Sequence, residues 1–364
     1  MNIVMFDDSI PYDGFTAATK PLGGAEKAFA SIAGALAKSG HSVTVINKCK
    51  HALMAEGARW RPLDSGNRPA EADVLIALRN PDLLGGVRRV DTRILWVVGD
   101  PKYLGNAQNA DLLASYAPRL LFLTEHQAAA YGGRLSAVVT PPGVNKAFFP
   151  ERKDIDPYPD ANHPAIPLDE PEKEEEPEGP PPPHAIVTTH PLHGLSNILE
   201  LWRDRIHTVL PEAKLTVYSA VLTKGLADDE VPEAIGPVLD LVKSCAEVNV
   251  EVSAPKGDRA MADAYRQSRV HLYPGHAKDY VCWTLRDSQA AGVPAVTRSL
   301  GGVEDVVENG TTGFIVPDDD AFANVALQLL TDDSVYTSFH NAAAAVERRK
   351  TWSTAADIVA QMWL

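Results

Sequence analysis

Short apolar runs alternate with amphipathic helical segments along this chain, and one proline-rich stretch interrupts the alternation. Strand-like runs occupy 2–6, 42–47, 72–78, 92–98 and 120–124 before the interruption, and 185–189, 214–218, 247–254 and 270–273 after it. Strands and helices that alternate at this length are typical of parallel sheets covered by helices. Because 364 residues are too many for one ordinary core, we expect two such α/β domains.

The interruption lies over residues 151–183 and differs from both flanks in composition. It holds ten prolines in 33 residues, with eleven acidic and three basic side chains. Such a segment buries little apolar area and favours neither helix nor sheet. We predict an acidic interdomain insert over 151–183, an N-terminal domain over 1–150, a C-terminal domain over 184–350 and a terminal helical segment over 351–364.

Charge and cysteine content narrow the class of partner and the compartment. The formal net charge is −14, and the insert accounts for −8 of it, so we expect no nucleic-acid partner. The three cysteines form no metal or disulfide framework, which suits a reducing compartment. The first residues lack a basic segment and no apolar run is long enough to span a membrane, so we expect a cytoplasmic protein.

A glycine pair, Gly23-Gly24, precedes a helix predicted over about 25–39. Glycine lets a backbone approach a phosphate closely, and the N-terminus of a helix stabilises an anion. The pair therefore predicts a phosphate-facing loop, although an ordinary turn is the simpler alternative. A dinucleotide-binding domain is disfavoured, because no G-x-G-x-x-G follows the first strand.

Residues 271–317 hold the most informative pattern. An apolar strand ends at Pro274-Gly275, a polar loop carries Asp279, and a helix predicted over about 283–291 carries Asp287. The two acids are eight residues apart, so both can face one cleft if Asp279 lies in the loop before the helix. The free N–H groups of the helix N-terminus then lie between them. This order predicts a clamp for a sugar, a diphosphate and a ribose.

The same stretch resembles the C-terminal half of glycosyltransferase family 4, whose members are retaining, nucleotide-sugar-dependent enzymes with the GT-B fold. That family has a Glu, seven residues, a second Glu, a Gly-x-Pro-Val segment and a glycine turn. The positions that match lie in 279–287, 289–294, 301–307 and 310–317. The resemblance implies two Rossmann-like doubly wound domains that face a central cleft, with a C-terminal helix that crosses back to the N-terminal domain.

Three further segments resemble parts of the same family. Gly23-Gly24-Ala25-Glu26 matches its Gly-Gly-Ala-Glu segment, which faces the donor diphosphate, and 140–145 matches the turn that closes its N-terminal domain. His190 and His193 occupy the positions of the Arg and Lys that neutralise this diphosphate. An imidazole has an ordinary pKa of about 6.5, and a nearby diphosphate favours its protonated form. The alternative is two loop histidines without a ligand.

The resemblance also implies a role for each site residue. Asp287 is expected to bind the ribose diol and Asp279 a hydroxyl of the donor sugar. The backbone N–H groups of Cys282 and Trp283 are expected at the helix mouth, and Gly301-Gly302 in the wall near the diphosphate or base. Asp100, beside Trp96 at a strand end, either contacts an acceptor hydroxyl or is an ordinary turn residue.

The expected function is metal-independent transfer of a sugar, with retention, from a UDP- or GDP-sugar to a glycan, lipid-linked or small-molecule acceptor. No cofactor is expected beyond this donor. Envelope or exopolysaccharide biosynthesis is the family's usual setting, and peripheral membrane contact stays open.

Both acids are Asp where the family has Glu, the basic residues are His, and 96–101 lacks the family's histidine. These departures leave a second reading open, a GT-B protein that binds a nucleotide sugar or glycan with little turnover. A GT-B phosphorylase is disfavoured, because no pyridoxal-phosphate lysine or strongly basic phosphate site is visible.

Overall fold

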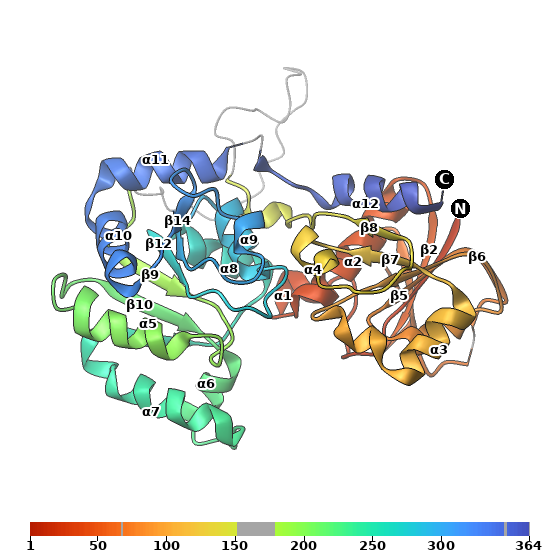
Figure 1. Ribbon diagram of the computed structural model, residues 1–364, viewed down its shortest axis with the longest axis horizontal. Helices are drawn as coiled ribbons and strands as arrows, with labels where there is room; N and C mark the ends of the chain where they lie inside the picture. The colour runs from red at the N-terminus through yellow and green to blue at the C-terminus, as the bar shows by residue number, and fades with distance from the viewer. Residues whose placement is uncertain (67, 151–178, 346–347, 364) are drawn as a thin grey trace, which may run out of the picture.

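The computed structural model describes residues 1–363 apart from 67, 151–178 and 346–347 (Figure 1). Most of the insert predicted over 151–183 therefore lies outside the described residues. The described part of the chain forms two α/β units, each built on its own sheet, which are called the N-terminal and C-terminal domains below. The predicted fold class, two domains with parallel sheets, is confirmed.

The N-terminal sheet has the strand order β3-β4-β2-β1-β5-β6-β7-β8. All neighbouring strands pair in parallel except β3 and β4, which form an antiparallel hairpin. The strands are β1 (Asn2–Phe6), β2 (Ser42–Asn47), β3 (Leu53–Ala55), β4 (Ala58–Pro62), β5 (Glu71–Leu78), β6 (Arg89–Trp96), β7 (Arg119–Phe122) and β8 (Ala137–Val139).

The C-terminal sheet is parallel throughout and has the strand order β11-β10-β9-β12-β13-β14. Its first strand, β9, lies in the middle, with β10 on one side and β12 on the other. The strands are β9 (His184–Val187), β10 (Lys214–Tyr218), β11 (Val250–Ser253), β12 (Val270–Tyr273), β13 (Ala295–Thr297) and β14 (Gly313–Ile315).

Helices cover both faces of each sheet (Figure 1). No helix in the described ranges is long and apolar enough to cross a membrane. The α-helices are α1 (Thr16–Thr19), α2 (Gly24–Lys38), α3 (Ala107–Tyr116), α4 (Glu125–Ala129), α5 (Leu195–Leu201), α6 (Ala220–Leu226), α7 (Gly236–Ser244), α8 (Asp258–Arg266), α9 (Trp283–Ala290), α10 (Asp319–Thr331), α11 (Asp333–Ala344) and α12 (Trp352–Ala360).

Successive side chains of the central strands enter different cores, because side chains alternate between the faces of a strand. In β1, Ile3 and Met5 pack with the α2 face, whereas Val4 and Phe6 pack with the face that Leu113 of α3 covers. The last helix, α12, joins the α2 core through buried Ala355, Ala356 and Val359, and Met362 of the 3₁₀ turn after it joins the same core. The predicted return of the C-terminal helix to the N-terminal domain is confirmed (Figure 1).

Several local predictions differ from the structure. The helix predicted over 196–210 starts at Leu195 and changes at Trp202 to a π-helical turn, Trp202–Ile206, in which the His207 N–H donates to the Trp202 carbonyl oxygen. The strand predicted over 247–254 begins only at Val250, because Asn249 has a left-handed backbone with φ 56°. The β3–β4 hairpin and the helices α3, α6 and α7 were not predicted. These elements are too short for their apolar side chains to repeat over several helical turns or strand positions.

A buried histidine makes the C-terminal domain sensitive to acid. His271 in β12 is fully buried between the hydroxyls of Ser288 and Thr188, and burial lowers its pKa to about 3. The unfolded chain takes up this proton near pH 6.5 and the folded chain does not. We therefore expect the free energy of unfolding to fall by about 1.4 kcal/mol for each pH unit below about 6.5. Denaturant titrations between pH 7 and 5 measure this slope.

The matched variant for this test is His271→Gln, which keeps polar atoms in place but does not titrate. It should show a shallower loss of stability between pH 7 and 5 than the wild-type protein. His51, which is exposed, offers the control substitution His51→Gln, for which the wild-type slope should persist. An equal slope in all three proteins would contradict the assignment to His271.

Candidate functional site at the domain boundary

The candidate site lies where loops at the carboxyl ends of strands from both sheets meet. In the C-terminal sheet, β9 and β12 are neighbours, so the loops after them, which carry His190 and Asp279, leave adjacent strands. Such a switch point opens a crevice, which is where α/β folds bind ligands. A cavity of about 150 Å³ lies here, lined by Val97, Val98, Gly99 and Leu123 of the N-terminal domain and by Lys278, Asp279, Tyr280, Val281 and Trp283 of the C-terminal domain.

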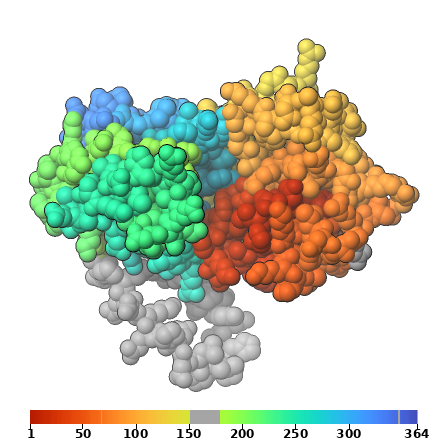
Figure 2. Space-filling view, turned by 90° about the horizontal axis from the view of Figure 1, so that it is seen from below, coloured from red at the N-terminus to blue at the C-terminus, as the bar shows by residue number. Residues whose placement is uncertain are grey.

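The two domains are in contact around this cavity. Tyr280 and Val281, from the loop before α9, pack into the α2 core of the N-terminal domain, and the Thr124 hydroxyl donates to the Tyr280 carbonyl oxygen at 3.0 Å. The domains abut along one boundary in the space-filling view (Figure 2). The described residues therefore show a closed arrangement, in which the loop that carries Asp279 reaches the opposite domain.

Asp279 lies in the loop before α9, as its spacing from Asp287 required. Its Oδ1 accepts the Cys282 N–H at 2.9 Å, and its Oδ2 accepts the hydroxyl of Tyr273. Burial, with nearby Cys282 and Asp279, raises the pKa of Tyr273, so its hydroxyl stays protonated and donates. The carboxylate is thus held in place from β12, and Asp279 forms part of the cavity wall.

The N-terminus of α9 has an unusual backbone at Cys282. This residue is left-handed, with φ 54°, and its N–H donates to Asp279 instead of remaining free for a ligand. Burial and Asp279 raise the pKa of the Cys282 thiol to about 12, so the thiol stays protonated at neutral pH. Trp283 is the first helical residue and also lines the cavity, so the free N–H groups of the helix begin there.

The glycine pair meets the α9 N-terminus across the domain boundary. Gly23 is the N-cap of α2, and Gly24 is its first residue. A Cβ atom added to Gly24 would lie 2.2 Å from the Trp283 Cγ, so the α2 backbone approaches the indole more closely than any side chain permits. The resemblance implied that this pair faces the donor diphosphate, and the structure places Gly24 against Trp283 at the N-terminus of α9.

Gly301 and Gly302 support the loop that carries Asp279. Gly301 has φ 66°, and a Cβ atom there would lie 2.4 Å from the His276 carbonyl oxygen. The Gly302 N–H donates to the Asp279 carbonyl oxygen at 2.9 Å. These glycines therefore lie directly behind the Asp279 loop and shape it through backbone contacts.

Three histidines from two loops form a cluster beside this loop. The ring centroids of His190 and His193 are 5.2 Å apart, and His193 stacks on His276 at 3.9 Å. Burial, with His276 and His190 nearby, lowers the pKa of His193, so its ring is neutral at pH 7 without a ligand. The sequence predicted His190 and His193 but missed His276. The signal for His276 was its place two residues after Pro274, where β12 meets the site loop.

Asp100 has a local structural role. Its Oδ1 accepts the Lys102 N–H at 3.0 Å and caps the short 3₁₀ helix Pro101–Gly105. It adjoins Gly99, which lines the cavity, but is not itself a lining residue. Of the two roles that the sequence left open for Asp100, the observed contacts are those of a turn residue.

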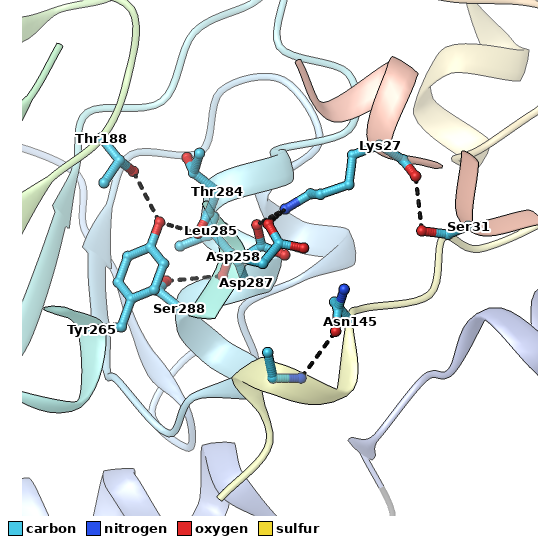
Figure 3. A network of polar contacts seen from close by, with 11 residues as sticks. Lys27, Ser31, Asn145, Thr188, Asp258, Tyr265, Thr284, Leu285, Asp287 and Ser288 are labelled. Carbon is cyan, nitrogen blue, oxygen red and sulfur yellow. Dashed lines mark hydrogen bonds and ion pairs between the residues drawn. The ribbon is translucent and has the colours of Figure 1, made fainter. Parts of the chain in front are cut away.

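Asp287 points from α9 toward the N-terminal domain and meets a lysine there (Figure 3). Its Oδ2 accepts from Lys27 Nζ of α2 at 2.6 Å, and the same ammonium donates to Asp258 Oδ1 of α8 at 3.0 Å. All three side chains are buried. The sequence missed Lys27 because it meets Asp287 only through the contact between the domains, and it missed Asp258 because α8 and α9 come together only in the folded C-terminal domain.

The protonation of this buried group follows from its charges. Burial and Asp258 raise the pKa of Asp287, while Lys27 opposes the rise. Burial disfavours the charged form of Lys27, but its pairs with Asp287 and Asp258 outweigh burial and raise its pKa. Lys27 is therefore charged at neutral pH and is the cation that opposes protonation of Asp287.

Comparison with known proteins finds sequence similarity in the same region. Residues 194–332 match the family model Glycosyl transferases group 1. A D-inositol 3-phosphate glycosyltransferase of Xylanimonas cellulosilytica is 32% identical over 137 residues, which cover 36% of this chain and 33% of that protein. One of Streptomyces avermitilis is 30% identical over 116 residues, which cover 31% of this chain and 25% of that protein. The chain therefore spans a quarter to a third of the curated relatives that it matches.

Solved structures resemble the whole chain. Sucrose-phosphate synthase from Thermosynechococcus elongatus has a TM-score of 0.69 at 13% identity, covering 100% of this chain and 98% of that one. HepE of Anabaena, solved with UDP and glucose, has a TM-score of 0.65 at 14% identity, covering 99% and 98%. The chain thus has the GT-B fold of glycosyltransferases, and its C-terminal domain carries the sequence pattern of Glycosyl transferases group 1.

Proposed function

We propose that this protein is a retaining, family-4-like glycosyltransferase that takes a sugar from a UDP- or GDP-sugar. The observation that carries the proposal is the cavity of about 150 Å³ in which Asp279 and Trp283 face the ends of β6 and β7. Asp279 and Trp283 lie on one wall of this cavity, and residues of the opposite domain form the other, whereas Asp287, His190 and His193 are not lining residues. HepE, which shares the fold, was solved with UDP and glucose, and this supports a nucleotide-sugar donor here.

The donor residues take the following roles in this proposal. Asp287 accepts a hydrogen bond from the nucleotide ribose, and Asp279, held by Tyr273 and the Cys282 N–H, accepts one from the donor sugar. The N-terminus of α9 and the backbone at Gly23-Gly24 lie near the diphosphate. Gly301 and Gly302 keep the Asp279 loop in its shape.

The chemical demand on the site is the negative charge that develops on the departing diphosphate. The proposal assigns its stabilisation to the α9 N-terminus, to backbone N–H groups and to protonated His190 and His193, without a metal ion or another cofactor. Contact between the domains excludes water and orients the acceptor over the sugar. The acceptor is a glycan, a lipid-linked sugar or a small molecule, and the proposed setting is cytoplasmic assembly of an envelope polysaccharide or exopolysaccharide.

Three observations favour a second candidate function, nucleotide-sugar binding with little turnover. Both oxygens of Asp279 already accept hydrogen bonds, Asp287 is paired with Lys27, and the pKa of His193 is lowered. A site with these features binds a donor but stabilises the leaving group weakly. Release of free nucleotide separates the two functions.

The test begins with thermal unfolding in the presence of UDP-, GDP- and ADP-sugars, followed by an assay of nucleotide release with candidate acceptors. Stabilisation by one nucleotide class together with acceptor-dependent release supports transfer, and NMR of the product reports the anomeric configuration. Stabilisation without release supports the binding function. If no nucleotide sugar raises the unfolding temperature at millimolar concentration, both functions are wrong.

The histidine cluster predicts a pH dependence of donor binding. His193 is neutral in the free protein because its pKa is lowered, and the diphosphate favours its charged form. Binding therefore takes up a proton, and we expect UDP affinity to rise as the pH falls from 8 to 6, by up to about tenfold per pH unit for one coupled proton. Calorimetric titration with UDP measures the dependence.

The variant His193→Arg places a permanent cation at the same position. It should bind UDP at pH 8 more tightly than the wild-type protein and show a flatter pH profile. His207, outside the cluster, offers the control His207→Arg, for which the wild-type profile should persist. A wild-type UDP affinity that does not change between pH 8 and 6 would contradict this role for the cluster.

A further inference from the structure

Lys27 connects the two domains at the candidate donor site. It belongs to the first turns of α2 in the N-terminal domain, but its ammonium lies between Asp258 and Asp287 of the C-terminal domain (Figure 3). The Lys27 side chain is 11% exposed, and its Nζ also lies 5.0 Å from the centre of the Phe148 ring. This is a buried contact between domains and not a surface ion pair.

Lys27 supplies the positive charge that partly compensates two buried carboxylates. Two buried carboxylates face one ammonium, and Asp258 Oδ2 is fully buried with no hydrogen-bond partner among the described residues. Tyr265 of α8 is the other titratable group beside Asp287, and its hydroxyl donates to the Thr284 carbonyl oxygen. Removing one partner of a buried ion pair leaves an uncompensated charge, which is costly. Without Lys27, the two acids would repel each other.

Lys27 occupies only one oxygen of Asp287. It bonds to Oδ2, and Oδ1 accepts no hydrogen bond from a residue in the described ranges. A carboxylate with one oxygen held by a fixed cation presents its other oxygen in a defined direction, and an ionised acceptor binds a hydroxyl more strongly than a neutral one. The arrangement suits a hydroxyl donor that reaches Oδ1.

We propose that Lys27 is a positioning residue of the donor site, which enters between Asp258 and Asp287 when the domains close and holds Asp287 ionised with one oxygen directed at the donor nucleotide. This inference rests on the proposed function, because it takes Asp287 as the acceptor for the nucleotide ribose. It adds a residue of the N-terminal domain to the ribose site of the C-terminal domain. Nucleotide binding and domain closure thereby become coupled.

The test compares UDP affinity by calorimetry between pH 6 and 9 in the wild-type protein, Lys27→Met and the double variant Lys27→Met/Asp258→Asn. In Lys27→Met, the pKa of Asp287 rises further, so the acid is neutral over a wider pH range. We expect UDP binding roughly tenfold weaker than wild type at pH 6.5, with a deficit that shrinks as the pH rises. The double variant removes the repelling charge of Asp258 but not the burial of Asp287, so it should recover part of the affinity, with a deficit that depends less on pH than that of Lys27→Met.

Two further variants complete the design. Lys38→Met removes an exposed lysine from the other end of α2 and should bind UDP as the wild-type protein does. Lys27→Arg keeps the cation and should retain most of the affinity even if Lys27→Met folds poorly. The double variant keeps the inference testable in that case as well, because its cluster has the same net charge as the wild-type cluster.

The outcomes separate the inference from the proposed function. A wild-type protein that binds no UDP, GDP or ADP overturns both. If the wild-type protein binds nucleotide and Lys27→Met binds it equally well or more tightly, the positioning role is wrong and the proposed function stands. A deficit in Lys27→Met that is constant with pH and is not relieved by Asp258→Asn would mean that Lys27 only joins the domains, which also overturns the positioning role.

Discussion

Replacing Asp287 by alanine is expected to weaken binding of the donor nucleotide roughly 10- to 100-fold. The estimate follows from the loss of one hydrogen bond to an ionised group, worth about 1.5–3 kcal/mol, since about 1.4 kcal/mol is a factor of ten in affinity. The fold should survive, because Lys27 keeps its ion pair with Asp258 at 3.0 Å and the contact between the domains remains. Calorimetric titration with UDP and GDP measures the affinity, and thermal unfolding checks the fold.

A matched control is available on the neighbouring helix. Asp263 of α8 is an exposed aspartate paired with Arg266, so Asp263→Ala removes the same side chain at a distance from the cavity. Its nucleotide affinity should equal that of the wild-type protein. Unchanged affinity in Asp287→Ala would remove Asp287 from the site and, with it, the assignment of the ribose to α9.

Replacing Gly24 by valine is expected to abolish most of the turnover while both domains stay folded. The new Cβ would lie 2.2–2.5 Å from three atoms of the Trp283 indole, which belongs to the other domain. Overpacking of this kind costs about 1–3 kcal/mol, and the domain boundary can relieve it by opening. An open boundary separates the glycine loop from the α9 N-terminus. We therefore expect at least a roughly 100-fold loss of turnover and a larger radius of gyration in X-ray scattering.

Two variants show whether the contact with Trp283 causes the loss. Gly24→Val/Trp283→Ala removes the indole and should restore the wild-type radius of gyration, although turnover stays low because Trp283 lines the cavity. Gly105→Ala adds a methyl group where nothing lies within 4 Å and should leave scattering and turnover unchanged. A compact, active Gly24→Val protein would show that this close approach has no role in the site.

Much of the fold could be predicted from local pattern. The buried central strands, such as β1 and β9, are short apolar runs, and α2 repeats its apolar side chains with helical spacing and ends before Gly40. The β3–β4 hairpin could not be predicted in this way. Trp60 is its fully buried anchor, and it is isolated among polar residues in the sequence.

The site residues likewise fall into those that local spacing predicts and those that only the folded structure reveals. Asp279, Asp287 and the loop glycines lie within one stretch of chain, so their spacing predicts a common location. Tyr273 and His276 belong to the same stretch but have no distinctive spacing, and their contacts with Asp279 and His193 appear only in the folded loops. Asp100 shows the opposite case, because the sequence allowed two roles and the observed hydrogen bond to Lys102 satisfies the local one.

The amino-acid sequence by itself determined two α/β domains and the placing of an acid, a helix N-terminus and a second acid along one segment, because strand and helix periods and short spacings are local properties. Only the tertiary structure decided which groups compensate the buried charge of Asp287. Lys27 lies 260 residues away from it in the chain, and the two meet because separate domains bring α2 and α9 together. Electrostatic interactions depend on distance in space and on burial, and neither can be read from the order of the residues.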